Sequence, residues 1–210
     1  MTMRRQVAKF WRDRCAAAGA EFALLALVFA GIILGIIDFN LVMYEHNRAE
    51  KACQVGVRYA VMNDIVAPGI ANWDSAAAGC TSGDDIPLGA LSPNPVVCNS
   101  TSCSGGYGFD SNAYQAIVNE MSMVYDRVAT DPAVQVEITY ENIGMGFCGN
   151  PYGPDIWPLT TVRITGATHD FITPLVGALT DLEFSCEATL TGEDFKTCEN
   201  GTGASWCPSP

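Results

Sequence analysis

Few residues in this chain could carry out chemistry, and their spacing matches no common catalytic arrangement. There are two histidines: His46 lies just beyond the long apolar run, and His169 lies beside Asp170. A hydrolase needs a nucleophile within reach of a base that a third group orients. The sequence contains no nucleophile-elbow or phosphate-loop pattern. We therefore predict no catalytic residue, no enzyme activity and no cofactor, and we interpret His169 as a polar residue at the end of a strand.

Cysteine offers more chemistry, because the chain has nine of them. Cys15 precedes a long apolar run, and eight follow it: Cys53, Cys80, Cys98, Cys103, Cys148, Cys186, Cys198 and Cys207. An even number is what a disulfide framework in an oxidising compartment requires. Zinc is the alternative, since Cys98 and Cys103 have a loose ligand spacing, but no second close pair or nearby histidine completes a site. We predict disulfides of open connectivity and no metal.

The charge of the chain is distributed unevenly. The net charge is −12, yet residues 1–20 carry five Lys and Arg against one Asp. The rest of the chain has six basic residues against 22 acidic ones. An acidic body repels phosphate backbones, so we predict no binding of nucleic acid. The basic tip precedes the apolar run, and the positive-inside rule places it in the cytoplasm.

The apolar run is long enough to cross a membrane. Residues 22–37 are uncharged, Asp38 interrupts the run, and apolar residues extend it to Tyr44. At about 1.5 Å per residue, 22–44 covers about 34 Å, compared with a hydrocarbon core of about 30 Å. A cleaved signal peptide is the alternative, but no small-x-small site follows Ile37. We predict a cytoplasmic tip at 1–20, a retained transmembrane helix at 21–44, and Asp38 near its outer end.

The helical pattern continues beyond the membrane. Apolar residues recur at three- and four-residue steps, which predicts a stalk over 45–66 and one helix of about fifty residues in all. Gly56 is expected to lower the stability of that helix locally, by an amount that the helix tolerates. We predict that the remaining residues, 67–210, form a separate domain outside the cytoplasm.

This exterior domain is predicted to be α+β. Residues 63–110 are expected to be a long loop held by disulfides. Residues 112–129 are expected to form a helix with Ser111 as its cap. Alternation predicts strands over 134–140, about 159–167, and 181–190, where Cys186 points inward. The predicted fold is a long helix, a second helix and a small, mostly antiparallel sheet tied by disulfides. The apolar segment 171–179 is expected to cover one face of the sheet, with an exposed partner surface as the alternative.

Several short motifs in the helical half form a recognisable set. They are Arg12-Asp13-Arg14, Ala16 to Gly19, Glu21-Phe22-Ala23-Leu24, Gly35-Ile36-Ile37-Asp38-Phe39 and Gly56-Val57-Arg58-Tyr59-Ala60. With them the chain resembles the TadE-like family, specifically over about residues 10–62, more weakly over 159–190, and not over 63–158. The resemblance implies a pseudopilin-like membrane protein of a tight-adherence (Tad/Flp) pilus system.

The resemblance also suggests a role for Glu21. Some members of the family resemble prepilins, which a prepilin peptidase cuts, typically after Gly, so that Glu is fifth in the mature chain. Here Glu21 is fifth if cutting follows Ala16 and second if it follows Gly19. In an assembled fibre Glu21 could pair with the new N-terminal ammonium of a neighbour. The alternative is a carboxylate solvated by lipid headgroups.

Two further positions could contact another helix in the membrane. Gly31 and Gly35 have the spacing that lets two helices approach closely in lipid, although such spacings also occur by chance. Asp38 could hydrogen-bond to a partner helix or could lie at the interface. We count both glycines and Asp38, with Ala16, Gly19 and Glu21, as candidate packing and processing residues.

The leading hypothesis is a minor pilin-like or accessory subunit of a Tad-type pilus machine. It would sit in the inner membrane of a bacterium with its C-terminal domain in the periplasm or on the pilus. Expected partners are the lipid bilayer, other pilin-like or Tad-apparatus membrane proteins, and a prepilin peptidase. The alternatives are a tethered adhesin or ligand-binding module, and a tethered hydrolase built on His169, Asp170 and the Gly-rich loop 143–158.

Overall fold

The computed structural model describes residues 14–73, 75, 79–92, 94–150, 154–169, 171 and 182–192. The chain divides into two compact units. The first comprises Met1–Tyr44 and His169–Leu182, and the second comprises Glu45–Thr168 and Glu183–Pro210.

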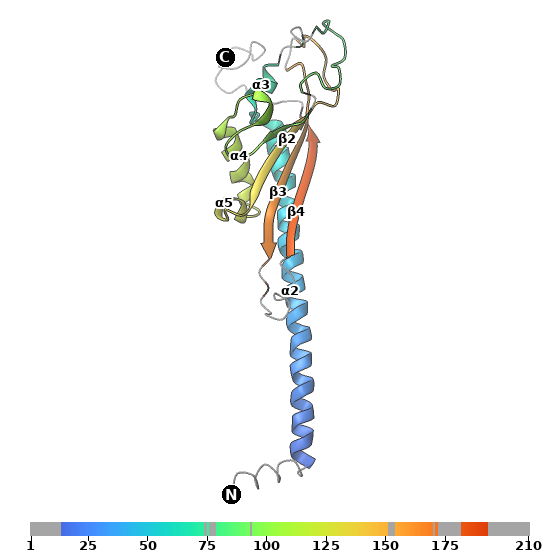
Figure 1. Ribbon diagram of the computed structural model, residues 1–210, viewed down its shortest axis with the longest axis vertical. Helices are drawn as coiled ribbons and strands as arrows, with labels where there is room; N and C mark the ends of the chain where they lie inside the picture. Colours follow the sequence, from blue (N-terminus) through green and yellow to red (C-terminus); the bar gives the residue numbers. More distant parts are fainter. Residues whose placement is uncertain are drawn as a thin grey trace. The chain divides into compact units, whose positions relative to one another are not determined.

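One helix, α2, runs without interruption from Arg14 to Met62 over 49 residues (Figure 1). This confirms the predicted long helix, which no proline interrupts before Pro68. Within the first unit, the side chains from residue 18 to Tyr44 are exposed, except for the buried Asp38 and Val42 and the half-buried Gly35. By length and composition α2 could cross a membrane, and it is the one such helix among the described residues.

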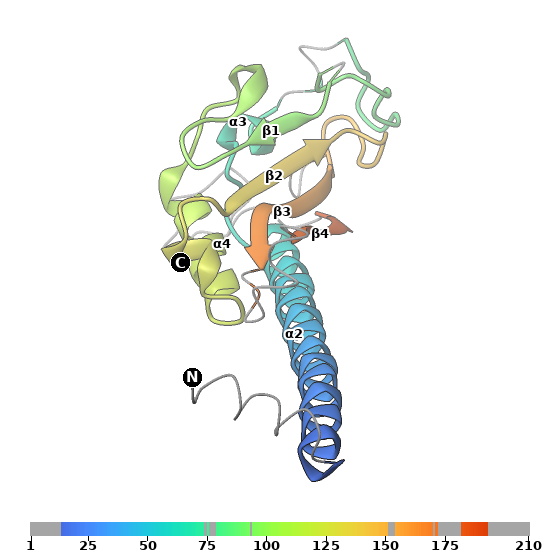
Figure 2. The same cartoon turned by 60° about the horizontal axis from the view of Figure 1, so that its bottom comes forward.

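The second unit contains a four-stranded sheet in the order β1-β2-β3-β4 (Figure 2). The strands are Val96–Cys98, Gln135–Glu141, Leu159–His169 and Leu182–Thr191. Both β1 with β2 and β2 with β3 pair antiparallel, with Ile138 opposite Val162. The predicted α+β class and small antiparallel sheet are therefore confirmed. Alternate side chains of β2 point into the core or out to solvent, as the sequence pattern predicts.

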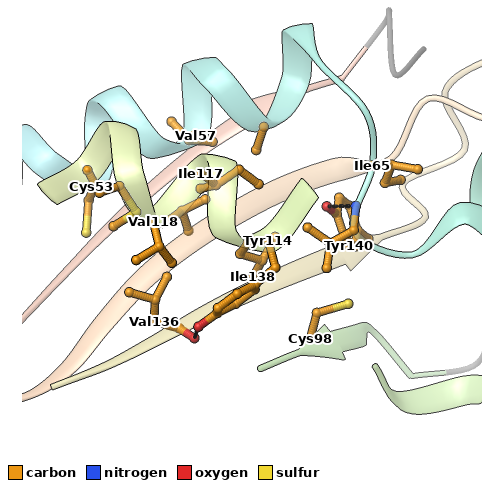
Figure 3. Packing of buried hydrophobic residues seen from close by; sticks show 14 of the residues in the cluster. Cys53, Val57, Ile65, Cys98, Tyr114, Ile117, Val118, Val136, Ile138 and Tyr140 are labelled. Atoms are coloured by element: carbon orange, nitrogen blue, oxygen red, sulfur yellow. Dashed lines mark hydrogen bonds between the residues drawn. The ribbon is translucent and has the colours of Figure 1, made fainter. Parts of the chain in front are cut away.

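The core lies between α2, the helix α4 (Ser111–Ser122) and one face of the sheet. Figure 3 shows Val57 of α2, Ile117 of α4 and Ile138 of β2 in this cluster. Two tyrosines add buried hydrogen bonds. The Tyr114 hydroxyl donates to the Val136 carbonyl at 2.9 Å, and the Tyr140 hydroxyl accepts from the Val66 N–H at 3.2 Å. Burial raises the pKa of Tyr114 to about 12 and also raises that of Tyr140, so both phenols stay neutral.

The predicted helix over 112–129 was wrong in its length and its cap. The chain forms α4 and then a separate short helix, α5 (Arg127–Thr130). Asp110, not Ser111, is the cap, since its carboxylate accepts from the N–H groups of Asn112 and Ala113. The break between α4 and α5 exposes the Val124 carbonyl, which accepts from the Arg48 guanidinium at 2.8 Å. Arg48, which lies 76 residues away in the sequence, thus contacts the connection between the two helices.

The predicted long loop over 63–110 was also wrong in part. It contains the short helix α3 (Pro68–Ala71), strand β1 and a 3-10 turn, η1 (Ser104–Gly106). Three residues are too few for strand alternation to be visible in the sequence. What holds β1 is its pairing with β2 and the disulfide between Cys98 and Cys103.

Gly56 is a tight packing position rather than a tolerable weak spot. A Cβ added there would lie 2.6 Å from the Met121 Sδ, 2.8 Å from its Cγ and 3.2 Å from the Val162 Cγ1. Because Met121 is fully buried, it has little room to move. The glycine lets α2 approach α4 and β3 closely.

We expect Gly56→Ala to lower the free energy of unfolding by about 1–2 kcal/mol. Overpacking a core costs about 1–3 kcal/mol, and the better helix propensity of alanine offsets up to about 1 kcal/mol of it. Denaturant unfolding of the full chain in detergent measures the change. Gln54→Ala, on the exposed side of the same helix, is the control and should be near neutral. A Gly56→Ala variant as stable as wild type would mean that Met121 moves freely.

Candidate assembly site

The candidate packing residues all lie on α2. Ala16 falls within the helix, but its side chain is outside the described part of the structure. Glu21 and Gly19 lie near the start of the helix, where Glu21 is exposed. The helix brings Gly31, Gly35 and Asp38 to within two turns of one another. It does not bring Glu21 to them, because ten residues of helix span about 15 Å.

Gly31 and Gly35 border open space. A Cβ added at either position would meet no atom within 4 Å. The two residues are four apart, so they lie on one face of the helix, one above the other. The large side chains nearby are exposed, among them Phe29 at 65% and Ile32 at 56%. This face can therefore receive another helix at short range.

Leucine at both glycines is expected to keep the protein in the membrane and to lower helix-to-helix contact. The added bulk separates backbones that small residues would let approach. Disulfide or photochemical cross-linking between anchor helices of neighbouring subunits measures the effect. Ala23→Leu with Ala26→Leu is the matched control, because it adds bulk elsewhere on the same exposed helix. Unchanged cross-linking in the double leucine variant of the glycines would leave their spacing as chance.

Asp38 differs from every other charged residue of the anchor segment. It is 1% exposed, and Val42, one turn later, is 7% exposed. Its side chain interacts within the chain. The neighbouring Asn40 side chain donates to the Ile36 carbonyl at 2.7 Å. Asp38 and Val42 are therefore buried on one side of a helix whose other side chains are exposed in the same two turns.

Six of the eight predicted disulfide cysteines form pairs. Cys53 pairs with Cys186, Cys80 with Cys148, and Cys98 with Cys103. Their Cα atoms are 6.4, 6.0 and 4.0 Å apart, within or near the range that a disulfide spans. Cys198 and Cys207 lie outside the described residues. The first pair joins α2 to β4 and fixes the sheet covalently to the helix.

Two arginines anchor the α4–α5 connection to the start of the second unit. Arg48 contacts Asp126 at 3.1 Å, and its guanidinium lies over the Tyr125 ring. Arg127 contacts Asp131 at 2.7 Å and Glu45 at 3.7 Å. The hydrogen bond from Arg127 lowers the pKa of Asp131. Sequence reasoning missed this cluster, because its members have no common spacing along the chain.

A second polar cluster joins two loops of the second unit. The buried Ser75 donates to the Asp155 carboxylate and accepts from the Gly149 N–H at 3.0 Å. The Asn150 N–H donates to the same carboxylate at 2.7 Å. Burial raises the pKa of Asp155, but the hydrogen bonds from Ser75 and Asn150 outweigh it and leave the pKa below its ordinary value. Together with the disulfide between Cys80 and Cys148, this cluster ties the segment that contains Ser75 to the segment that contains Asp155.

Of the residues that suggested hydrolase chemistry, the structure describes His169 but not Asp170. His169 ends β3, is 6% exposed, and packs edge-on against Phe171 at 5.1 Å. A cavity of about 320 Å³ opens between α4, α5 and β2, and His169 is not among its lining residues. His46 lies 3.7 Å from Glu50. Asp170 and most of the apolar segment 171–179 lie outside the described residues.

No cluster of three metal-ligating side chains occurs in the part of the chain that the structure describes. The three disulfides account for the cysteines that zinc would need there.

Residues 16–58 match the family model described as TadE-like protein. The match lies within the residues for which the sequence motifs indicated this family, and it confirms that resemblance. It ends at Arg58, so the weaker likeness over 159–190 lies outside it. No curated protein and no solved structure has significant similarity to the chain.

Proposed function

We propose that this chain, which carries a TadE-like segment at residues 16–58, is a membrane-anchored, pseudopilin-like subunit of a Tad-type pilus apparatus. It acts by helix packing and protein contacts and not by catalysis. Its partners are other pilin-like or Tad-apparatus proteins of the inner membrane. The domain beyond Tyr44 lies in the periplasm or on the assembled pilus.

The proposal rests on one observation: the two halves of α2 have different surroundings. Its first half exposes Phe22, Leu27 and other large apolar side chains. Its second half buries Ala52, Cys53 and Val57 in the core of a disulfide-tied domain. One continuous helix therefore carries a lipid-soluble surface and forms part of a folded exterior module. This is what a subunit that packs laterally in a membrane or fibre requires.

We expect the cysteines beyond the anchor to be protected on the outer side of the membrane. A maleimide that cannot cross the cytoplasmic membrane should label none of them in intact spheroplasts, and several after mild reduction. The reason is that an oxidising compartment keeps the pairs closed. Labelling of a cysteine introduced at Ser122, which is partly exposed, is the positive control. Extensive labelling before reduction, or none after it, would contradict the topology.

Deletion and complementation test the function itself. Removing the gene should abolish or sharply reduce pilus assembly and surface adhesion, and a plasmid copy should restore both. A copy with the anchor replaced by an unrelated transmembrane helix should insert and fold but fail to restore assembly. Unchanged pili in the deletion strain would refute the proposal.

A further inference from the structure

We infer that the second unit binds a further copy of this chain through two different surfaces. A basic face on α2 of one copy contacts an acidic face on the outside of the sheet of the next. The inference deepens the assembly role proposed above and rests on it. It concerns which surfaces of the exterior domain meet, a question separate from the anchor.

The basic face consists of Lys51 and Arg58, with Gln54 between them. All three are exposed, and a spacing of seven residues puts Lys51 and Arg58 on the same side of the helix, about 10 Å apart. Neither cation has a partner among the described residues, whereas Arg48, Arg127 and Arg163 all form ion pairs. Two unpaired cations on one face stand out in a domain where acidic residues far outnumber basic ones.

The acidic face is the solvent side of β2, β3 and β4. Alternation brings to it Glu137 and Glu141 of β2 and Glu183 and Glu187 of β4, with Arg163 of β3 as the single cation. Arg163 lies opposite Glu137 and 3.7 Å from Glu187. The face therefore keeps a negative excess after its internal ion pair is formed. No described segment covers it, since Glu141, Glu183 and Glu187 are all exposed.

The two faces belong to opposite sides of the same unit. The inner face of the sheet packs on α2 through Val162 near Gly56 and through the disulfide of Cys186 with Cys53. Lys51 and Arg58 point away from that contact. One unit consequently presents positive charge on its helix side and negative charge on its sheet side. Different patches that complement each other give a heterologous contact, which repeats from copy to copy instead of closing into a dimer.

The spacings of the charges match. Glu183 and Glu187 are four residues apart on a strand, which corresponds to about 13 Å. Lys51 and Arg58 are about 10 Å apart along the helix. Their side chains are long and flexible enough to reach both carboxylates. A contact of this kind is weak by itself in salt. Two copies anchored in one membrane meet at a high effective concentration, however, so a weak contact is sufficient.

Photochemical cross-linking in native membranes tests the contact with the full chain. A benzophenone amino acid at Gln54 should cross-link two differently tagged copies, and the captured peptide should come from residues 159–168 or 183–192. The same probe at Gln115, on the exposed side of α4, is the control and should capture no second copy.

Charge reversal then tests the complementarity. Either Lys51→Glu with Arg58→Glu, or Glu183→Lys with Glu187→Lys, should reduce the Gln54 cross-link to about a tenth or less, because like charges then face each other. Co-expressing the two double variants should restore it, since each face again meets its opposite. Asp84→Lys with Glu120→Lys is the matched control and should leave the yield unchanged, because Asp84 lies in a loop and Glu120 on α4, not on α2 or the sheet.

Three results would overturn the inference. They are a cross-link that survives either reversal, a mixture of the two variants that does not recover, and a Gln54 probe that captures no second copy but only lipid or a different protein. Protection of Cys53 and Cys186 from thiol reagents confirms that each variant has folded. Failure here is distinct from failure of the proposed function, since piliation of the deletion strain reports on the latter alone.

Discussion

Alanine at both Cys53 and Cys186 is expected to destabilise the second unit more than the loss of any other described disulfide. In the loop-closure model a disulfide stabilises by restricting the unfolded chain. The bond between Cys53 and Cys186 closes a separation of 133 residues, which corresponds to about 5 kcal/mol. The bond between Cys98 and Cys103 closes a separation of 5, which corresponds to about 2 kcal/mol.

Denaturant unfolding of the full chain in detergent, followed by tryptophan fluorescence, measures both losses. The double alanine variant at Cys98 and Cys103 is the matched control, because it also removes one bond from buried or partly buried cysteines. The variant at Cys53 and Cys186 should in addition expose β4 to proteases, since the bond fixes that strand to α2. Equal losses in the two variants would show that loop length does not govern the effect.

Alanine at Glu21 is expected to abolish incorporation of the protein with other subunits while leaving it in the membrane. On insertion scales an acidic residue costs about 2.5–3.5 kcal/mol near the middle of a bilayer and less toward its edge. Glu21→Ala should therefore help insertion. If the carboxylate pairs with the ammonium of a neighbour, the same change removes the pair, and assembly stops.

Subcellular fractionation and recovery of the protein in sheared pili measure the two effects separately. Glu21→Asp, with a shorter reach, should give a partial defect, and Glu21→Gln, with the same size but no charge, should resemble alanine. Wild-type assembly by the alanine variant at normal protein levels would reduce Glu21 to a marker of topology. The N-terminal residue of the mature protein decides whether a free ammonium exists near Ala16 or Gly19.

Much of the fold was predictable because its elements are periodic. α2 shows apolar steps of three and four, and β2, β3 and β4 alternate strictly enough for their bounds to be placed within about two residues. The break between α4 and α5 was not predictable, since the sequence from Ser111 to Thr130 is suited to one helix. The carbonyl freed at this break is bonded by Arg48, a residue from another element.

Some features of the candidate site were likewise predictable from the sequence, and others were not. The exposed helix face with Gly31 and Gly35 follows from composition and spacing alone. The pairing of Cys53 with Cys186 does not, because only the packed sheet brings Cys53 of α2 beside β4, the last of the described strands. The need for glycine at position 56 was hidden for the same reason, since Met121 and Val162 come from distant parts of the chain.

The nesting of two disulfides has a consequence for how such a chain is made. Cys80 and Cys148 lie between Cys53 and Cys186 in the sequence, so under the proposed topology Cys53 would cross the membrane first and its partner long afterwards. Cys80 and Cys98 would reach the outer side in the interval. Oxidation in order of arrival would then join the wrong thiols, and exchange between thiols and disulfides is slow without a catalyst. Under that topology, correct maturation would depend on a disulfide isomerase, or on keeping Cys53 reduced until β4 has crossed the membrane.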